Sequence, residues 1–314
     1  MKINARKNNN IRAAVPFLAI IVIFILFKIL QPERFGTAHS INVLIQQSLM
    51  QSIIGCGLYF LNEMGIFDMT MGANMIISAM IACKMSEIIG MPGLILGGIL
   101  TGMLISLIGS LFMTRLKINP MIISVGLIII YEAISTMLTQ GAYALQIAQE
   151  YRGFGKTPGN IIISVGVLAV SAFLAKYTKF GLYINAIGAN QNIASSMGIH
   201  VLKFKSYAFL YAGACAGIMG IVNICYSNSM GAASGLSSAS AIFSPLMACM
   251  FAGAYKKYLN PILALILGNL FMSLIANGLL TNGLESSLQN VFIGIMLLIL
   301  VHSSSNNRKY DVSK

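Results

Sequence analysis

Ten apolar stretches, separated by short polar segments, follow one another along the 314 residues of this chain. They cover residues 13–30, 41–61, 70–89, 92–112, 120–139, 160–175, 204–226, 239–254, 259–280 and 287–302. A helix needs about 20 mostly apolar residues to cross the hydrocarbon core of a bilayer. Because a spanning segment must satisfy its own backbone hydrogen bonds, the pattern predicts an all-α bundle of about ten membrane spans. The third, sixth and eighth stretches are short or polar, and the sequence leaves their continuity open.

The composition excludes an ordinary soluble domain. Charged residues make up 9% of the chain and hydrophobic residues 57%, with a mean hydropathy of +0.82. A soluble domain carries about 25% charged residues. The sequence therefore predicts a multi-pass helical membrane protein.

The distribution of lysine and arginine tests this arrangement. When the N-terminus is placed in the cytosol and each span reverses the side, 15 of the 20 Lys and Arg residues are cytosolic. The others are Lys28, Arg34, Lys84, Arg152 and Lys156. This excess follows the positive-inside rule and predicts that both termini are cytosolic. The cations are spread over several segments and form no single basic patch, so we expect no nucleic-acid partner.

Three regions follow from this topology: a basic cytosolic N-terminus (1–12), a membrane domain (13–302) and a cytosolic tail (303–314). The longest polar interruption is the cytosolic loop 176–205, which holds four lysines and no acid. A structured aqueous segment of this length in a lipid-embedded chain is expected to dock a soluble partner. Residues 190–199 predict a short amphipathic helix with Ile193 and Met197 on one side.

Glycines spaced four residues apart predict close helix packing. Gly93 and Gly97, Gly98 and Gly102, and Gly213 and Gly217 form such pairs. Small residues at this spacing let helix backbones approach closely in lipid. Glycine is also common in membrane helices, so the pairs indicate packing and no particular function.

Three short patterns are more specific. Residues 65–72 read Gly-Ile-Phe-Asp-Met-Thr-Met-Gly; the loop carries Gly181, Ala186, Gly188, Asn190, Ala194, Gly198 and Ile199; and the C-terminal part carries Asn277, Gly278, Gln289 and Gly294. Over roughly residues 40–302 the chain resembles the permease subunits of ribose-type bacterial ABC importers. That group also includes permeases for branched-chain amino acids and nucleosides. Phe67 departs from the family pattern as an insertion or shift.

The resemblance implies a coupling helix in the loop, pressed against a cytosolic ATPase subunit through the region of Gly181, Gly188, Asn190, Ala194, Gly198 and Ile199. It further implies a location in the bacterial inner membrane, in contact with lipid. The expected partners are an extracytoplasmic solute-binding protein and a second permease chain, which is either identical or similar. This chain is expected to bind no cofactor, because ATP and magnesium belong to the partner ATPase.

The expected translocation path is neutral and polar. Its candidates are Gln46, Gln47, Gln51, Asp68, Thr70, Glu132, Asn269 and Asn277. Glutamine offers both donors and acceptors, which sugar hydroxyls need. Amides in a span also join neighbouring helices, and the sequence leaves both roles open. Asp68 follows a glycine-flanked break and either caps the next helix or lines the path.

Glu132 stands in the middle of the fifth stretch, where related permeases often have Arg. A carboxylate costs about 2.5–3.5 kcal/mol at the centre of a span. The Ile, Leu and Val residues of the stretch return about 4 kcal/mol, so the span still inserts with Glu132 facing the protein interior. A structural partner, a protonated carboxyl group and a substrate contact remain open.

No sequence motif indicates catalysis. Gly155-Lys156-Thr157 resembles the tail of a phosphate-binding loop, but Glu150 stands where the first glycine should be. His39, His200 and His302 are widely separated and predict no metal site. We therefore expect a non-catalytic permease that imports a small polar solute, by resemblance a monosaccharide. The alternatives are nucleosides or branched-chain amino acids within the class, and an ion-coupled secondary transporter outside it.

Overall fold

The computed structural model describes residues 2–116, 118–256, 258–283, 291 and 294–295. The chain divides into two compact units. The first comprises Met1–Ser52 and Phe243–Lys314, and the second comprises Ile53–Ile242. Helix α2 (Ala38–Glu63) contributes its first part to one unit and its last part to the other.

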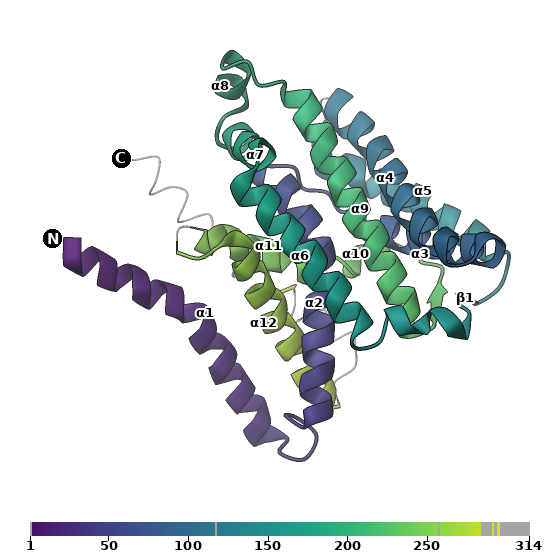
Figure 1. Ribbon diagram of the computed structural model, residues 1–314, viewed down its shortest axis with the longest axis horizontal. Helices are drawn as coiled ribbons and strands as arrows, with labels where there is room; N and C mark the ends of the chain where they lie inside the picture. Colours follow the sequence, from purple (N-terminus) through teal and green to yellow (C-terminus); the bar gives the residue numbers. More distant parts are fainter. Residues whose placement is uncertain (1, 117, 257, 284–290, 292–293, 296–314) are drawn as a thin grey trace. The chain divides into compact units, whose positions relative to one another are not determined.

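The first unit contains α1 (Lys2–Leu30), the start of α2, α11 (Phe243–Tyr255) and α12 (Pro261–Thr281). Its α12 packs against both α1 and α11. An apolar cluster holds α1, α2 and α12 together, made of Phe27, Phe35, Leu44, Leu274, Ile275 and Leu279. Helix α1 begins before the predicted span, and its ribbon bends part-way along (Figure 1). Pro16 lies inside this helix and removes a backbone donor, which is a common cause of such bends.

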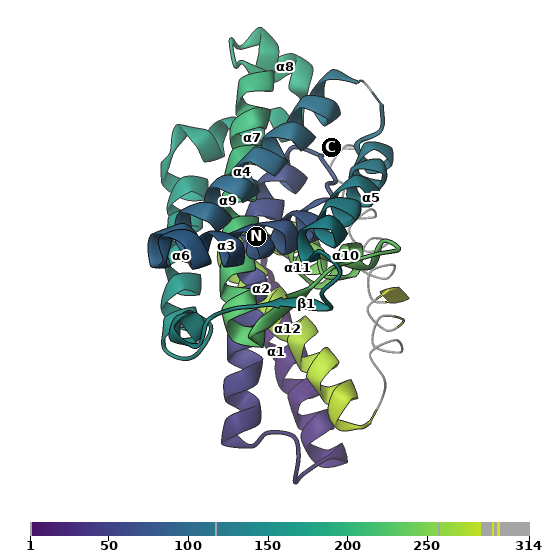
Figure 2. The ribbon, with the colours of Figure 1, turned by 90° about the vertical axis from the view of Figure 1, so that its right-hand side faces the viewer.

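The second unit is built around α3 (Met71–Ile89), α4 (Met91–Arg115) and α9 (Val201–Ser227), which pack against one another. Helix α5 (Pro120–Thr139) packs on α3 and α4. The remaining elements are α6 (Gly159–Tyr177), α7 (Lys179–Ala189), α8 (Gln191–Ser196), α10 (Ser237–Ser240) and a short 3-10 helix, η1 (Gln149–Phe154). Figure 2 shows α7 and α8 at one end of this unit and strand β1 toward the other.

Glycines allow the close contact between α4 and α9. A Cβ atom added at Gly102 would collide with the backbone oxygen of Gly213, and one added at Gly217 would collide with that of Gly98. Gly93 meets the backbone of α3 at Met85 in the same way. The predicted close packing at the glycine pairs is confirmed, because these helices touch backbone to backbone.

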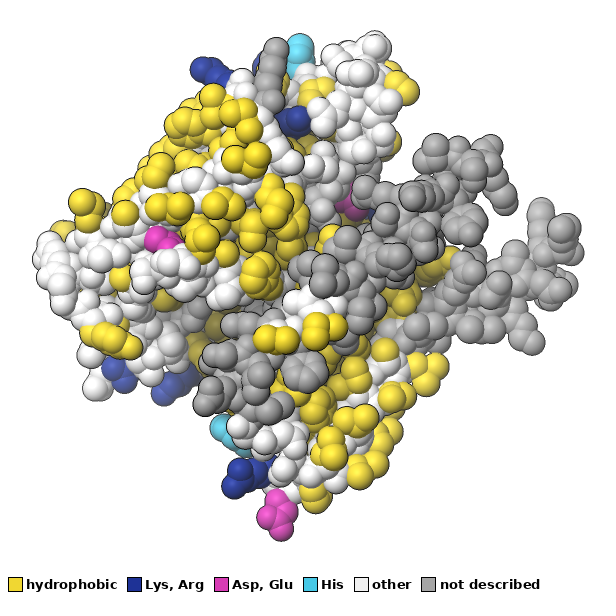
Figure 3. Space-filling model, turned by 180° about the vertical axis from the view of Figure 1, so that it is seen from behind, with side chains coloured by type: hydrophobic (Ala, Val, Ile, Leu, Met, Phe, Trp, Pro, Cys, Tyr) yellow, Lys and Arg dark blue, Asp and Glu magenta, His cyan; other side chains and the backbone are white. Residues whose placement is uncertain are grey.

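Eight described helical segments are long and apolar enough to cross a membrane, when α10 and α11 are counted together as Ser237–Tyr255, and all eight correspond to predicted spans. The apolar part of α1, Pro16–Leu30, is shorter than the other spans, and the tenth predicted span lies outside the described residues. A count of about ten thus stays a prediction, as does the cytosolic placement of both termini. Hydrophobic side chains cover much of the face in Figure 3, as expected of a surface that contacts lipid.

Two details differ from the sequence expectations. The chain is predominantly helical, but β1 (Ala144–Gln146) and β2 (Ser229–Gly231) pair as a small antiparallel ribbon, so it is not purely all-α. The segment 176–205 is largely helical, because α6 extends to Tyr177, α7 and α8 follow, and α9 begins at Val201.

The sequence left the continuity of three spans open. In the structure α3 and α6 are continuous, and the eighth span is broken between α10 and α11.

Candidate functional site

A polar seam joins α2 to α11 and α12 in the first unit. The amide of Asn277 donates to Gln47 Oε1 at 2.8 Å and to the backbone oxygen of Ser273 at 2.9 Å. The amide of Asn269 donates to Ser52 Oγ at 3.1 Å. On α11, the hydroxyl of Ser244 donates to Gln51 Oε1 at 2.8 Å. Uncharged polar side chains of α2 therefore bond directly to both α11 and α12.

Two buried polar atoms of this seam have no hydrogen-bond partner. Asn269 and Ser273 are buried, and neither Asn269 Oδ1 nor Ser273 Oγ has a hydrogen-bond partner. A buried polar atom without a partner costs roughly 1–3 kcal/mol, so such atoms in a native protein often mark a ligand or water position. Gln46 is also buried, but its amide donates to Asn42 within the same helix.

In the second unit, Asp68 organises the turn that leads into α3. Its Oδ1 accepts hydrogen bonds from the backbone N–H of Thr70 at 2.8 Å and from the Thr70 hydroxyl at 2.7 Å. Both side chains are buried, and Asp68 Oδ2 has no partner. The role of Asp68 in the turn is therefore structural, and its second oxygen stays free for a further donor.

Asn74 is a buried polar residue that the sequence analysis missed. Its amide donates to the backbone oxygen of Gly102 at 3.0 Å and to Ser106 Oγ at 2.9 Å, and its Oδ1 accepts from Ser78 at 3.1 Å. The spacing of Thr70, Asn74 and Ser78, each four residues apart on one helix face, is the signal that could have revealed it. Asn74 joins α3 to α4 where α4 meets α9.

Glu132 has a structural partner in the broken span. Its Oε2 accepts from the backbone N–H of Leu236 at 2.9 Å. Its Oε1 accepts from the N–H of Ser238 at 2.9 Å and from the Ser238 hydroxyl at 2.7 Å. Three donors therefore converge on one buried carboxyl group. Glu132 thus caps the beginning of α10, with both oxygens engaged.

A second contact fixes α10 against α3. A Cβ atom added at Gly72 would collide with the backbone oxygen of Ser238. Ser135, one turn after Glu132 on α5, accepts from the N–H of Ala233 at 3.2 Å. The start of α3, the middle of α5 and the start of α10 therefore form one polar junction inside the second unit.

The eight predicted path residues fall into separate groups. Gln46, Gln47, Gln51, Asn269 and Asn277 belong to the first unit, and Asp68, Thr70 and Glu132 belong to the second. Within the first unit the structure directly joins Gln47 to Asn277, and within the second it joins Asp68 to Thr70. Their shared lining of a path stays a prediction.

The predicted coupling residues build both ends of α8. The side chain of Asn190 accepts from the N–H groups of Asn192 and Ile193, which caps the N-terminus. At the other end Gly198 has φ of +82°, and the N–H of Ile199 bonds to the oxygen of Ala194 at 3.1 Å. This is a Schellman termination, for which glycine is the usual residue.

The two other glycines of the coupling loop allow close contacts. A Cβ atom added at Gly181 would collide with the oxygen of Ala175 in α6, and one added at Gly188 would collide with the oxygen of Glu63 at the end of α2. On α8 itself Ala194 is buried, whereas Ile193 and Met197 are 59% and 73% exposed. An apolar pair thus faces outward from a helix that is held rigidly at both ends.

Comparisons with known proteins agree with this architecture. Residues 40–301 match the family described as the permease component of branched-chain amino acid transport systems. The D-allose transport system permease protein of Escherichia coli is 25% identical, covering 91% of this chain and 89% of that protein. The ribose import permease protein of Bacillus subtilis is also 25% identical, covering 91% and 90%. The fructose import permease protein of Rhizobium meliloti is 21% identical, covering 92% and 84%.

A solved structure also shares the fold. It is described as an inward-facing conformation of an ABC transporter assigned to the metal-chelate type. The two chains superpose with a TM-score of 0.56 at 10% identity, covering 93% of this chain and 98% of the other. The matched family consists of non-catalytic subunits of ABC transporters. This chain belongs to that family, and it is a multi-pass permease subunit of an inner-membrane ABC importer.

Proposed function

We propose that this permease carries a neutral monosaccharide, a pentose or a hexose, into the cell. The observation that carries the proposal is the uncharged polar seam of α2, α11 and α12, in which Asn269 Oδ1 and Ser273 Oγ are buried and unpartnered. Sugar hydroxyl groups both donate and accept, and amides and hydroxyls complement them without charge. The full-length relatives described above are permeases for allose, fructose and ribose, which supports the same solute class.

We further propose that the seam belongs to the translocation path, which includes Gln46, Gln47, Gln51, Asn269 and Asn277, together with Asp68 and Thr70 at the start of α3. Glu132 was a candidate for the same path. Its two oxygens are occupied by donors from the start of α10, so we assign it to the wall of the path, away from the solute.

The ATP hydrolysis that drives transport is expected on a partner subunit. We propose that a cytosolic ATPase subunit, which binds ATP and magnesium, docks against α8 through Ile193 and Met197. Six residues of the coupling loop shape this docking helix and hold it in place: Gly181, Gly188, Asn190, Ala194, Gly198 and Ile199. A binding protein on the outer face delivers the solute, and two permease chains, identical or similar, form the membrane part. The proposed topology has about ten spans, with residues 1–12 and 303–314 in the cytosol.

Uptake by intact cells tests the class and the solute together. Cells that express this chain together with a partner ATPase and a binding protein are offered radiolabelled pentoses, hexoses, nucleosides and branched-chain amino acids. We expect uptake of one monosaccharide, loss of uptake when the ATPase is inactivated, and persistence when the proton gradient is dissipated. Uptake that collapses with the gradient but survives ATPase inactivation would identify an ion-coupled secondary transporter instead.

One observation favours a second solute class. The matched family is described by branched-chain amino acid transport. Those solutes carry an ammonium and a carboxylate group, and such charges usually require complementary charges in the site. Competition by excess leucine or isoleucine, with no effect of sugars, would assign the permease to this class. Competition by nucleosides alone would identify the chain as a nucleoside permease.

A further inference from the structure

A hollow opens between two spans of the second unit, at the end that carries the coupling helix. It has a volume of about 320 Å³ and lies between the last turns of α4 and the first turns of α9. Its lining residues are Leu111, Thr114, Arg115, Leu202, Lys203, Ser206 and Tyr207. Sites for small molecules begin at about 300 Å³. None of the lining residues is acidic, and the comparisons assign no role to this place.

The polar groups of the hollow favour an anion. Among the described residues, the side chains of Arg115 and Lys203 make no hydrogen bond or ion pair. The hydroxyl of Ser206 accepts from Ser110 at 3.4 Å, and its own proton has no described acceptor. The hydroxyl of Thr114 is already committed to the backbone oxygen of Ser110 at 2.6 Å. The available donors are therefore the Arg115 guanidinium, the Ser206 hydroxyl and, at the rim, the Lys203 ammonium.

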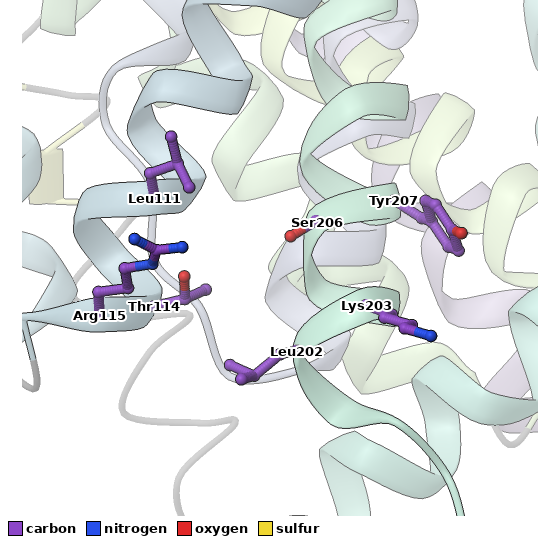
Figure 4. Close-up of a pocket in the computed structure, with 7 residues that line it drawn as sticks. All are labelled: Leu111, Thr114, Arg115, Leu202, Lys203, Ser206 and Tyr207. Atoms are coloured by element: carbon purple, nitrogen blue, oxygen red, sulfur yellow. The ribbon is translucent and has the colours of Figure 1, made fainter.

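Figure 4 shows how these groups lie. Arg115 and Thr114 extend from α4, Ser206 points from α9 toward α4, and Leu202 lies below them. The ends of Lys203 and Tyr207 point away from α4. Arg115 and Ser206 therefore face the same gap from opposite helices, and a phosphate group between them would receive donors from both. A planar guanidinium group binds phosphate oxygens in pairs.

The apolar residues decide between a free anion and a lipid. Leu111 is 50% exposed and Leu202 is 63% exposed, and both flank the gap at the ends of membrane-spanning helices. This is the level at which head groups meet acyl chains, and basic pockets between spans at this level bind anionic lipids. A free phosphate would gain nothing from Leu111 and Leu202, whereas the chains of a phospholipid would cover them.

We propose that this hollow, formed by Arg115, Ser206, Leu111 and Leu202, binds the phosphate group of an anionic phospholipid such as phosphatidylglycerol. The lipid would join the end of α4 to the start of α9. The lipid would lie beside the coupling segment, because Lys205, in the first turns of α9, donates to Gln191 of α8 at 3.0 Å. The bound head group would thereby stabilise the first turns of α9, to which α8 is bonded.

Lipid-dependent stability of the purified full-length chain tests the proposal. Thermal unfolding is followed in mixed micelles while the mole fraction of phosphatidylglycerol is raised, with phosphatidylcholine and inorganic phosphate as separate arms. We expect phosphatidylglycerol to raise the unfolding temperature, with the other two arms inactive. Arg115→Gln should weaken the apparent affinity for phosphatidylglycerol about tenfold, because a charge-assisted contact is lost. Native mass spectrometry should find phosphatidylglycerol retained on the wild type and depleted on the variant.

Lys179→Gln is the matched control, because Lys179 is an exposed cation of the coupling segment that does not line the hollow. It should behave as the wild type does. An equal loss of bound phosphatidylglycerol in Lys179→Gln would show that the lipid is attracted by overall charge, and it would overturn the site. Unchanged lipid retention in Arg115→Gln would also overturn it. Protection by inorganic phosphate alone would overturn the lipid assignment. If Arg115→Gln fails to fold in phosphatidylcholine micelles, Ser206→Leu fills the hollow from α9 and should show the same depletion; normal retention there would refute the proposal.

Discussion

The carboxylate of Glu132 on α5 holds Ser238 at the start of α10 through two hydrogen bonds, from the backbone N–H at 2.9 Å and from the hydroxyl at 2.7 Å. The two residues are 106 positions apart in the chain. The contact explains how an acid is tolerated in the middle of a span. Hydrogen bonds to a charged group contribute roughly 1.5–3 kcal/mol each, enough to offset the insertion cost of the carboxylate.

Glu132→Gln should destabilise the second unit. The amide nitrogen of glutamine would face a donor of α10, so at least one buried N–H or O–H would lose its acceptor. We expect the free energy of unfolding to fall by about 2 kcal/mol. The measurement is thermal unfolding in detergent with a thiol-reactive dye, which reports exposure of the five buried cysteines. Glu87→Gln, at an exposed position of α3, is the control and should change little. A variant at Glu132 as stable as that control would contradict the structural role.

Gly102→Ala should disturb the contact between α4 and α9. The added methyl group would collide with the backbone oxygen of Gly213, and two helix backbones would have to separate. We expect a loss of about 1–3 kcal/mol, the usual cost of overpacking, and a reduced yield of folded protein. Gly109→Ala on the same helix adds its methyl group to open space and should be neutral. Identical unfolding temperatures for the two variants would mean that these helices do not meet through glycine.

Ile193→Asp and Met197→Asp should uncouple transport from ATP hydrolysis. Ile193 on α8 and Met197 at its C-cap are both exposed, so the substitutions leave the fold intact and place a charge in an apolar docking surface. We expect ATP-driven uptake to fall at least tenfold while membrane insertion and the unfolding temperature stay unchanged. Asn192→Asp, at an exposed polar position of α8, should retain most uptake. Full uptake in both variants would exclude this face of α8 as the docking site.

Ala194 and Gly198 are less suitable places for such a test. Ala194 is buried, and Gly198 occupies the left-handed region, so a charged residue at either position would disturb α8 itself. Gly198→Ala should cost about 1 kcal/mol of local stability. Hydrogen exchange of the α8 amides measures this cost, and unchanged protection of α8 would show that the helix end does not depend on glycine.

Asn277→Leu should weaken the seam between α12 and α2. The substitution leaves Gln47 Oε1 without its donor, and we expect an unfolding penalty of about 1–2 kcal/mol. The double variant Asn277→Leu, Gln47→Leu should cost less than the sum of the single variants, because both partners of the bond are then gone. If the seam lines the path, each single variant should also raise the KM for uptake. Additive penalties with an unchanged KM would place the seam outside the path.

Features with a local origin could be predicted from the sequence. Eight spans follow from the length of their apolar stretches. The short helix α8 was predicted within residues 190–199 from the spacing of Ile193 and Met197, and its ends are set locally by Asn190 and Gly198. The glycine pairs predicted close packing because the missing side chain is itself the cause. In each case the residues that determine the feature lie within one helix or one turn.

Features that depend on distant partners could not be predicted. Glu132 meets α10 only after the chain has folded back over about a hundred residues, so its role stayed open between structure and solute. Asn277 and Gln47 are 230 positions apart, and their amides gave no sign of bonding to each other. Ala194 resembled a contact residue in the family pattern, but its burial is decided by packing of the coupling segment.

Reconstituted transport tests the central claim most directly. The purified chain is placed in liposomes with and without its partner ATPase. ATP is supplied on the side of the membrane that carries the ATPase, and the binding protein with labelled monosaccharide is supplied on the other side. The account predicts transport of the sugar only when ATP, ATPase and this chain are all present, and its loss in Ile193→Asp. Transport of the sugar by this chain alone, without the ATPase, would contradict it.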